Sequence, residues 1–329
     1  MKSRNVVYLL LSCVFITGCG TPLSDGSGYE WGHTGAGSFD NDPFNLAPFG
    51  SPLIDGNGIL YTLRSGTIDP DHIYGWARIT KSYYDTVYDC LMHKCSNLSK
   101  GYFYVSFQYP ASWETMPPED KQQAAHQIAL ETAQYLAFND GLWHEVATWY
   151  GYRTFPLISD FQSALSWEDL YSDRLGTVVA AQAIDRGGDF NANVSLLTKL
   201  ELQKRELVDT ARAKSITRTM KNIAYKDDPL AKKILWRNLD IGAGDGQINP
   251  VVFPGFSQKP PIPLPAPTLD LLDTYNVKAE IIVSPSSPKY STIKSRANIT
   301  GPLMPSKHNE QILSVIKQDA LRRGFRVFD

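Results

Sequence analysis

Three separated segments of the sequence concentrate histidines and carboxylic acids at spacings that could do chemistry. Imidazole and carboxylate groups are the side chains that bind zinc and that move protons near neutral pH. A site built from all three would draw its ligands, or its acid and base, from distant parts of the chain. The segments are SGTIDPDHIYGWAR (65–78), WHEVATWYGY (143–152) and SALSWEDLYSDRLGT (163–177).

The adjacent pair His144 and Glu145 resembles half of a zinc-protease helix. Such a helix needs a second histidine four residues after the first, so that both imidazoles face one metal. That position holds Thr148, and a hydroxyl is a poor zinc ligand beside imidazole. The sequence therefore disfavours an ordinary zinc protease and leaves a different kind of site open.

A different site forms if the loop that carries the first segment folds over the helices that carry the other two. His72 and His144 would then be metal ligands, and the catalytic carboxylates would be Glu145, Asp69 and Asp173. Two imidazoles with one or two carboxylates suit a hydrolytic zinc ion that keeps an open position for water. Without a metal, the same groups would act as general acid and base.

Each of these candidate residues could have a structural role instead of a catalytic one. His144 could donate to a backbone carbonyl at a helix start, where Glu145 would favour the helix dipole without any catalytic role. Glu168 and Asp169 are expected in the first turn of a helix, where capping explains them as well as catalysis does. Asp173 could pair with an arginine such as Arg153.

Three further residues are candidate binding groups. Arg78 could pair with Asp69 or with an anionic substrate. Trp149 belongs to a dense set of aromatic residues, which usually pack a core but also line pockets for sugars or lipid headgroups. His126, on an alanine-rich helix, is either a packed histidine or a further binding group.

The N-terminus has the pattern of a bacterial lipoprotein. A positively charged start, MKSRN, precedes an apolar run over residues 6–16, which is too short to span a bilayer but suits a signal peptide. The run leads into ITGC, a lipobox, so we expect cleavage before Cys19 and several acyl chains on that residue. An ordinary secretory peptide with an incidental cysteine is the alternative. Gly20 follows instead of Asp, which favours the periplasmic face of the outer membrane.

Two cysteines remain in the mature chain after Cys19, namely Cys90 and Cys95. An even pair in an oxidising compartment predicts a disulfide. His93 lies between them, so a Cys/His metal site is an alternative, although the sequence offers no fourth ligand nearby. With a net charge of -2 and no basic stripe, the chain is not expected to bind nucleic acid.

Hydrophobic periodicity predicts an α+β fold: a predominantly helical main domain with short strands, plus a small α/β C-terminal segment. The expected divisions are a signal peptide (1–18), a flexible tether (19–45), a main domain (46–245), a Pro-rich connector (246–270) and the C-terminal segment (271–329). We expect strands at 59–64, 101–110, 277–285 and 325–329, and helices at about 118–138, around 143–152, and at 163–184, 195–224, 228–237 and 306–324.

Behind a lipobox, the three chemistry-bearing segments together resemble the bacterial lipoproteins of domain of unknown function family 4056. The resemblance covers most of the mature chain, and the segments at 143–152 and 163–177 are its specific part. It implies that the three segments form one unit, and it implies no particular activity.

The sequence therefore predicts an outer-membrane-anchored periplasmic lipoprotein that hydrolyses an envelope substrate, with zinc or by acid–base catalysis. The alternative is a non-catalytic envelope lipoprotein that binds a polymer or protein partner or has a structural role. Hydrolysis needs His72, His144 and a carboxylate oxygen within roughly 3–5 Å of a shared point in an open cleft. A buried network of mutually bonded groups would favour the alternative.

Replacing Cys19 by Ser should abolish lipid attachment, because the thioether forms on that sulfur. We expect the wild-type protein and the signal-peptide control Cys13→Ser to incorporate a palmitate analogue fed to the cells, and to fractionate with membranes. Lipid incorporation that survives in Cys19→Ser would contradict anchoring at this residue.

Overall fold

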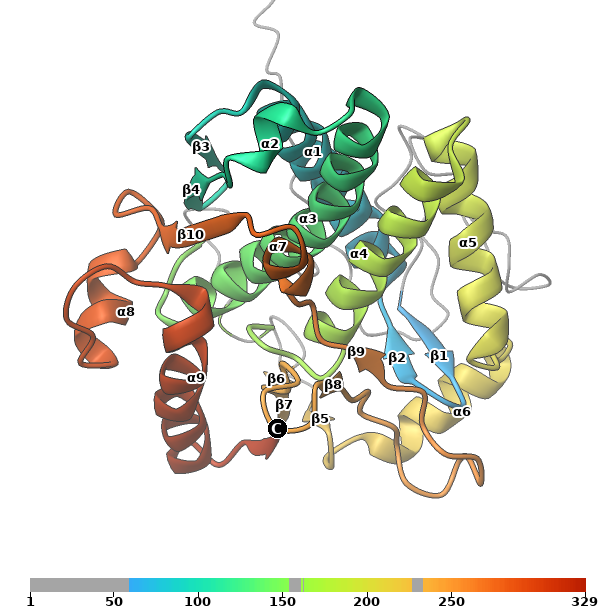
Figure 1. The fold of residues 1–329 in the computed structure, drawn as a ribbon. Helices are drawn as coiled ribbons and strands as arrows, with labels where there is room; N and C mark the ends of the chain where they lie inside the picture. Colours follow the sequence, from blue (N-terminus) through green and yellow to red (C-terminus); the bar gives the residue numbers. More distant parts are fainter. Residues whose placement is uncertain (1–58, 154–160, 162, 227–232) are drawn as a thin grey trace, which may run out of the picture.

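The computed structural model describes residues 59–153, 161, 163–226 and 233–329. This part of the chain combines nine helices with several short sheets, which confirms the α+β class. Figure 1 shows long helices at the centre, with further helices and the short strands around them. The expected signal peptide and tether, with Cys19, lie outside the described residues.

Three long helices form the centre of the fold: α1 (Pro70–His93), α3 (Pro118–Trp149) and α4 (Asp169–Arg186), each in contact with the other two. Glycine permits one of these close approaches. A Cβ on Gly176 of α4 would lie 2.6 Å from the carbonyl oxygen of Ile73 on α1. The crossing of α1 and α4 therefore requires a residue without a side chain at this point.

The sequence predicts a loop over 65–78, and this expectation is wrong. The segment forms the short strand β2 (Gly66–Ile68) and the first turns of α1. The carboxylate of Asp69 accepts hydrogen bonds from the backbone N–H groups of the first turn, and Pro70 occupies the first helical position. An Asp followed by Pro is a strong start signal, because both residues suit a helix N-terminus.

The second and third segments also differ from expectation. Instead of two helices, α3 runs without a break to Trp149, so His144 and Glu145 lie in its last turns rather than at a helix start. Asn139 and Gly141 have low helix propensity, but burial between neighbouring helices overrides it. The third helix begins at Asp169 and not at 163, because Leu165 adopts a left-handed conformation with φ 57°.

Other helix predictions fail where turns or strands intervene. The helix expected at 195–224 is two helices, α5 (Phe190–Lys204) and α6 (Thr210–Met220), separated by a turn. The helix expected at 228–237 is wrong over its described part, which forms strands β6 (Lys233–Ile234) and β7 (Trp236–Asn238).

The main sheet joins distant parts of the chain. Strand β4 (Phe103–Gln108) pairs antiparallel with β3 (Asn97–Lys100) on one side and with β10 (Lys278–Val283) on the other. Alternate residues of β4 are buried, as its period-two pattern predicts. The C-terminal segment therefore shares a sheet with the preceding helical domain.

The remaining elements are short, except for the helix near the C-terminus. In that helix Ile312 and Ile316 are buried, whereas Leu321 is 53% exposed. The strand after it pairs in parallel with β7. These elements are β1 (Leu60–Thr62), α2 (Ser112–Thr115), β5 (Tyr225–Lys226), β8 (Gln247–Ile248), β9 (Leu264–Pro265), α7 (Asp270–Thr274), α8 (Tyr290–Arg296), α9 (Pro305–Arg322) and β11 (Arg326–Phe328).

A second, smaller core anchors the turn that precedes α4. Trp167 is 1% exposed and makes an edge contact with Phe253, with 5.7 Å between ring centroids. Its indole N–H donates to Thr67 Oγ1 at 2.7 Å. The turn is thus fixed to the strand β2 that leads into α1.

Replacing Gly176 by Ala should destabilise the protein by about 1–3 kcal/mol, because the added methyl group would overpack the crossing against a backbone carbonyl. The gain in helix propensity, about 1 kcal/mol, does not relieve that contact. Gly244 is a matched control, since nothing lies within 4 Å of its missing Cβ. Denaturant unfolding measures the difference; equal stability of Gly176→Ala and Gly244→Ala would contradict the requirement.

Candidate functional site

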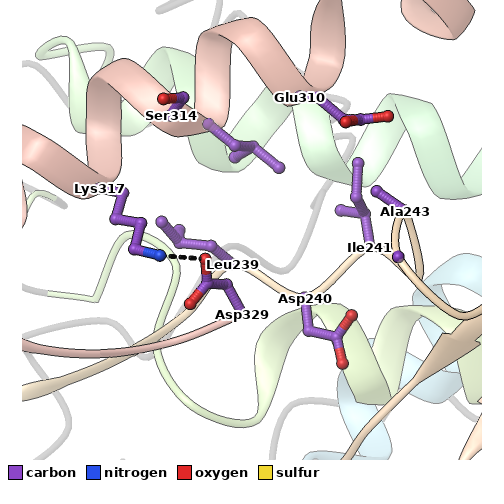
Figure 2. A pocket seen from close by; sticks show the side chains of 10 residues that line it. Leu239, Asp240, Ile241, Ala243, Glu310, Ser314, Lys317 and Asp329 are labelled. Carbon is purple, nitrogen blue, oxygen red and sulfur yellow. Dashed lines mark hydrogen bonds and ion pairs between the residues drawn. The ribbon is translucent and has the colours of Figure 1, made fainter.

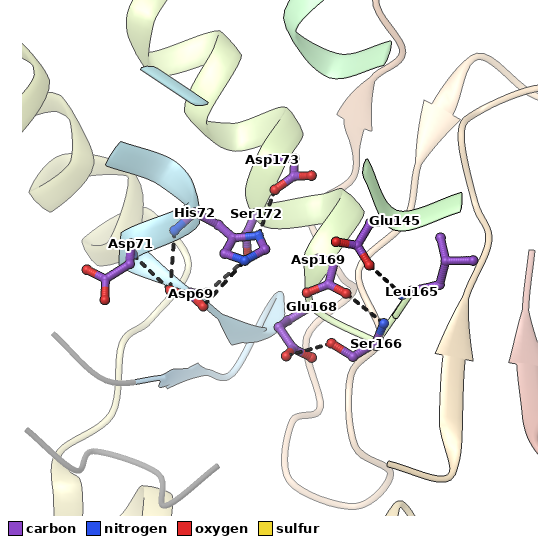
Figure 3. A network of polar contacts seen from close by, with 10 residues as sticks. All are labelled: Asp69, Asp71, His72, Glu145, Leu165, Ser166, Glu168, Asp169, Ser172 and Asp173. Carbon is purple, nitrogen blue, oxygen red and sulfur yellow. Dashed lines mark hydrogen bonds and ion pairs between the residues drawn. The ribbon is translucent and has the colours of Figure 1, made fainter. Parts of the chain in front are cut away.

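The three segments singled out in the sequence meet at one place, where α1 begins, α3 ends and α4 begins (Figure 3). They contribute one imidazole and several carboxyl groups, all withdrawn from solvent. His72 is 7% exposed, and Glu145 and Asp173 are each 1% exposed. The side chains at the centre of this buried network are His72 from α1, Glu145 from α3, and Asp169 and Asp173 from α4.

An imidazole and a carboxylate form the central pair. Nδ1 of His72 lies 2.8 Å from Oδ1 of Asp173, within hydrogen-bond range. The other ring nitrogen, Nε2, lies 3.9 Å from Oδ2 of Asp69, which is too far for a hydrogen bond. Asp173 therefore orients the ring, while the carboxylate of Asp69 caps α1 and faces the opposite ring nitrogen.

The turn before α4 donates two backbone N–H groups into the network. Leu165 N–H donates to Oε2 of Glu145 at 2.6 Å, and Ser166 N–H donates to Oδ2 of Asp169 at 2.7 Å. The two carboxyl groups also interact with each other, since the charge of Glu145 raises the pKa of Asp169. The bond from Ser166 to Asp169 resembles the carboxylate half of a capping box, and it lies inside the protein.

Glu168 extends the network toward Asp69. Its Oε1 accepts a hydrogen bond from Ser166 Oγ at 2.8 Å. Its Oε2 is buried and has no hydrogen-bond partner among the residues that the structure describes. A buried carboxylate oxygen without a donor is unfavourable while it is charged, so this position favours the protonated form.

Burial raises the pKa of each carboxyl group at the centre of the network. It raises the pKa of Glu145 to about 7, and it holds the pKa values of Glu168 and Asp169 well above their ordinary range. Burial also raises the pKa of Asp173, although the charge of the adjacent His72 opposes that shift. The network therefore retains protons near neutral pH.

His144 lies beside this network. Its half-buried ring makes an edge contact with Tyr152, with 5.9 Å between centroids, and its charge lowers the pKa of Asp173. Across residues 59–153, 161, 163–226 and 233–329, no three His, Cys, Asp or Glu side chains are grouped to hold a metal ion. His72 lies in the network and His144 lies beside it, and zinc binding by these two residues stays a prediction.

His126 and Arg78 occupy other places on the helices. The His126 ring lies 2.8 Å from the Tyr84 hydroxyl and 3.2 Å from Asp185 Oδ1. It precedes Glu145 on the same helix by about 28 Å, at 1.5 Å per residue. Arg78 is exposed on α1. Neither residue belongs to the network in Figure 3.

Trp149 is a core residue at the end of α3. It is 4% exposed and packs against Phe161 and Phe325. Its indole N–H donates to Asp319 Oδ2 at 3.2 Å. In this position it links α3 to α9 across the C-terminal part of the fold.

A disulfide joins Cys90 and Cys95, whose Cα atoms are 4.9 Å apart. It closes the turn that ends α1. His93, between the two cysteines, is 76% exposed and pairs with Asp89. The histidine thus points to solvent rather than toward the sulfur atoms.

Three buried acids were not assigned to a site from the sequence. Helix capping explains Glu168 and Asp169 equally well from the sequence, and Asp140 belongs to none of the three segments. Asp140 is 8% exposed, accepts a hydrogen bond from the Tyr83 hydroxyl at 2.9 Å, and has a pKa that burial raises to about 7. One available signal was the run of acids in EDLYSD, since residues four apart share a helix face.

These features define an α+β protein with a buried imidazole–carboxyl network at the junction of three helices. A family model described as "Protein of unknown function (DUF4056)" matches residues 31–233. The chain belongs to this family, as its three segments suggested. No curated protein and no solved structure matches the chain.

The stability of the protein should fall as the pH rises from about 4.5 to about 7. A carboxyl group whose pKa is raised by folding binds its proton more tightly in the folded state, so deprotonation across this window favours unfolding. Glu145, with a folded pKa of about 7, contributes to the fall. Replacing it by Gln should flatten the profile by roughly 1–3 kcal/mol.

Denaturant unfolding at several pH values measures this effect. The exposed first-turn residue Glu119 provides the control variant Glu119→Gln, which should keep the wild-type profile. An unfolding free energy that rises between pH 5 and pH 7, or an unchanged slope in Glu145→Gln, would contradict the raised pKa.

Proposed function

We propose that this protein is an envelope lipoprotein whose buried network performs acid–base hydrolysis of an envelope substrate. The observation that carries the proposal is the meeting of all three chemistry-bearing segments in one hydrogen-bonded cluster (Figure 3). In this proposal His72 is the general base and Asp173 holds its ring in the required tautomer.

The energetic disadvantage of the cluster supports a functional role. Carboxyl groups lose favourable hydration when they are buried, and an apolar packing of similar volume would be at least as stable. Strongly shifted pKa values occur preferentially at functional sites, where acids and bases must exchange protons near neutral pH. Glu145, with a pKa of about 7, suits the role of a proton donor or acceptor.

The geometry assigns distinct roles around the imidazole. With Nδ1 held by Asp173, Nε2 is the nitrogen that would take a proton from an attacking water molecule. Asp69 stands 3.9 Å from Nε2 and, at 17% exposure, is the more accessible of the two acids beside the ring. The charge of both acids would stabilise the imidazolium that forms. The protonated Glu145–Asp169 pair would return a proton to the leaving group.

We further propose that the mature chain is held at the periplasmic face of the outer membrane by lipid on Cys19. The lipobox and the signal-like run before it support this location. Within the described part of the chain, no helix has the length and apolar character needed to cross a bilayer. The membrane would then be a partner through the lipid, and a polymer of the envelope would be the substrate.

A second candidate is a non-catalytic lipoprotein that binds an envelope partner or has a structural role. The burial of His72 and Asp173, at 7% and 1% exposure, favours it, because a substrate must reach a catalytic base. In this alternative the network would stabilise the junction of α1, α3 and α4 and hold it in one arrangement.

Replacing His72 by Asn, or Asp173 by Asn, should lower hydrolysis by about 10²- to 10⁴-fold if the network is catalytic. The substrates are purified peptidoglycan and phospholipid vesicles, and product release is measured by mass spectrometry. His126→Asn is the control, because that ring lies far from the network. Wild-type activity at the level of His72→Asn on both substrates would favour the non-catalytic alternative.

Elemental analysis of the same purified proteins tests the zinc-dependent version. Acid–base hydrolysis by His72 alone predicts substoichiometric metal and activity that survives chelator. Stoichiometric zinc that is lost in His144→Ala would instead establish the metal-dependent version of the hydrolase.

A further inference from the structure

A cavity with a volume of about 350 Å³ lies between α9 and the loop that follows β7 (Figure 2). This volume is within the range of small-molecule sites, about 300–1,000 Å³. One wall is a single face of α9, on which Glu310, Leu313 and Lys317 recur at helical spacing. The facing wall is the loop from Leu239 to Gly244.

The charges around this cavity are unbalanced. Among the described residues that line it, Lys317 is the only cation, and it forms an ion pair with Asp329. Asp240 and Glu310 add two further carboxylates, and no other described residue of the lining is positively charged (Figure 2). The cavity therefore has a net negative charge, and it disfavours anionic ligands.

The loop wall is rigid because Asp240 fixes it. The carboxylate of Asp240 accepts hydrogen bonds from Gly242 N–H at 2.8 Å and from Asn249 N–H at 2.7 Å. The Gly-rich motif GAGDGQ (242–247) lacks the residues of a phosphate-binding loop, and two of its residues, Ala243 and Gly244, line the cavity. A wall that is already ordered loses little entropy when a ligand binds.

Glu310 is the acid that remains available to a ligand. It is exposed, and no hydrogen bond or ion pair involves it among the residues that the structure describes. Apolar side chains from both walls also line the cavity, namely Leu239, Ile241 and Leu313. An apolar lining next to a carboxylate matches a chain of methylene groups that ends in a cation.

We propose that this cavity binds the side chain of a lysine-type residue in a peptide. The methylene groups would pack against the apolar side chains of the two walls, and the ammonium group would pair with Glu310. All lining residues follow position 233, where the family match ends, so this site belongs to the C-terminal part of the chain. It is separate from the His72 network, and it does not depend on hydrolysis.

An NMR titration of the full chain in detergent tests the site. The probe is N-acetyl-lysine amide, and N-acetyl-norleucine amide is the neutral analogue with a similar apolar chain. The lysine probe should shift signals of α9 and the 239–244 loop and should bind about fivefold more tightly than the neutral analogue. Added salt should reduce this preference.

Glu310→Gln should remove the preference for the lysine probe, whereas the distant control Glu119→Gln should retain it. Because Glu310 is exposed, the variant should fold as the wild type does. The proposal is overturned if no binding is detected, if both probes bind equally to the wild type, or if Glu310→Gln keeps the preference. Loss of hydrolysis in His72→Asn would leave this result unchanged.

Discussion

Carboxyl groups removed from water at the junction of three helices impose the main constraint on this structure. Each group loses hydration that only hydrogen bonds, an opposite charge or a bound proton can replace. One imidazole, His72, faces several acids, so charge pairing alone cannot satisfy them. The remaining acids take backbone N–H groups or protons, as the raised pKa values of Glu145 and Asp169 indicate.

The surrounding fold provides backbone N–H donors and space for these carboxyl groups. The left-handed conformation of Leu165 turns two successive N–H groups toward Glu145 and Asp169. Trp167 anchors that turn in a second core. A glycine, Gly141, makes room for Asp173, since a Cβ there would lie 2.6 Å from the carboxylate. Backbone geometry and close helix packing therefore serve the same polar cluster.

The acids of the cavity beside α9 are in a different environment from those of the buried network. The cavity acids remain near the surface, where water and salt weaken their repulsion. Glu310 is exposed and so keeps its hydration until a cation approaches. The chain thus combines a closed cluster that retains protons with an open cavity that presents charge to a ligand.

Much of this arrangement could be read from the sequence, because its signals are local. Strand β4 followed from a period-two pattern, and the grouping of the three segments followed from their residue types and family resemblance. Helix α1 is absent from the sequence prediction, although Asp69 and Pro70 form a good start signal. The histidine and acids of the same segment favour a catalytic loop and mask its helical period.

The sequence predictions that fail at the site do so because the packing of distant helices decides the environment of each side chain. Asp169 does serve the turn before α4, as capping predicts, and the sequence does not reveal that the same carboxylate faces Glu145 in the interior. His144 and Glu145 are adjacent, yet the former lies half-buried beside the network and the latter lies inside it. Only the packing of α3 against α4 separates these two environments.

Infrared difference spectroscopy most directly tests whether the network retains a proton near neutral pH. The C=O stretch of a protonated carboxyl group is distinct from the bands of carboxylates. We expect a buried, protonated carboxyl band in the wild type at pH 6 that weakens above pH 7 and is altered in both Glu145→Gln and Asp169→Asn. Absence of this band at pH 6, or a band that both variants leave unchanged, would contradict a shared proton in the network.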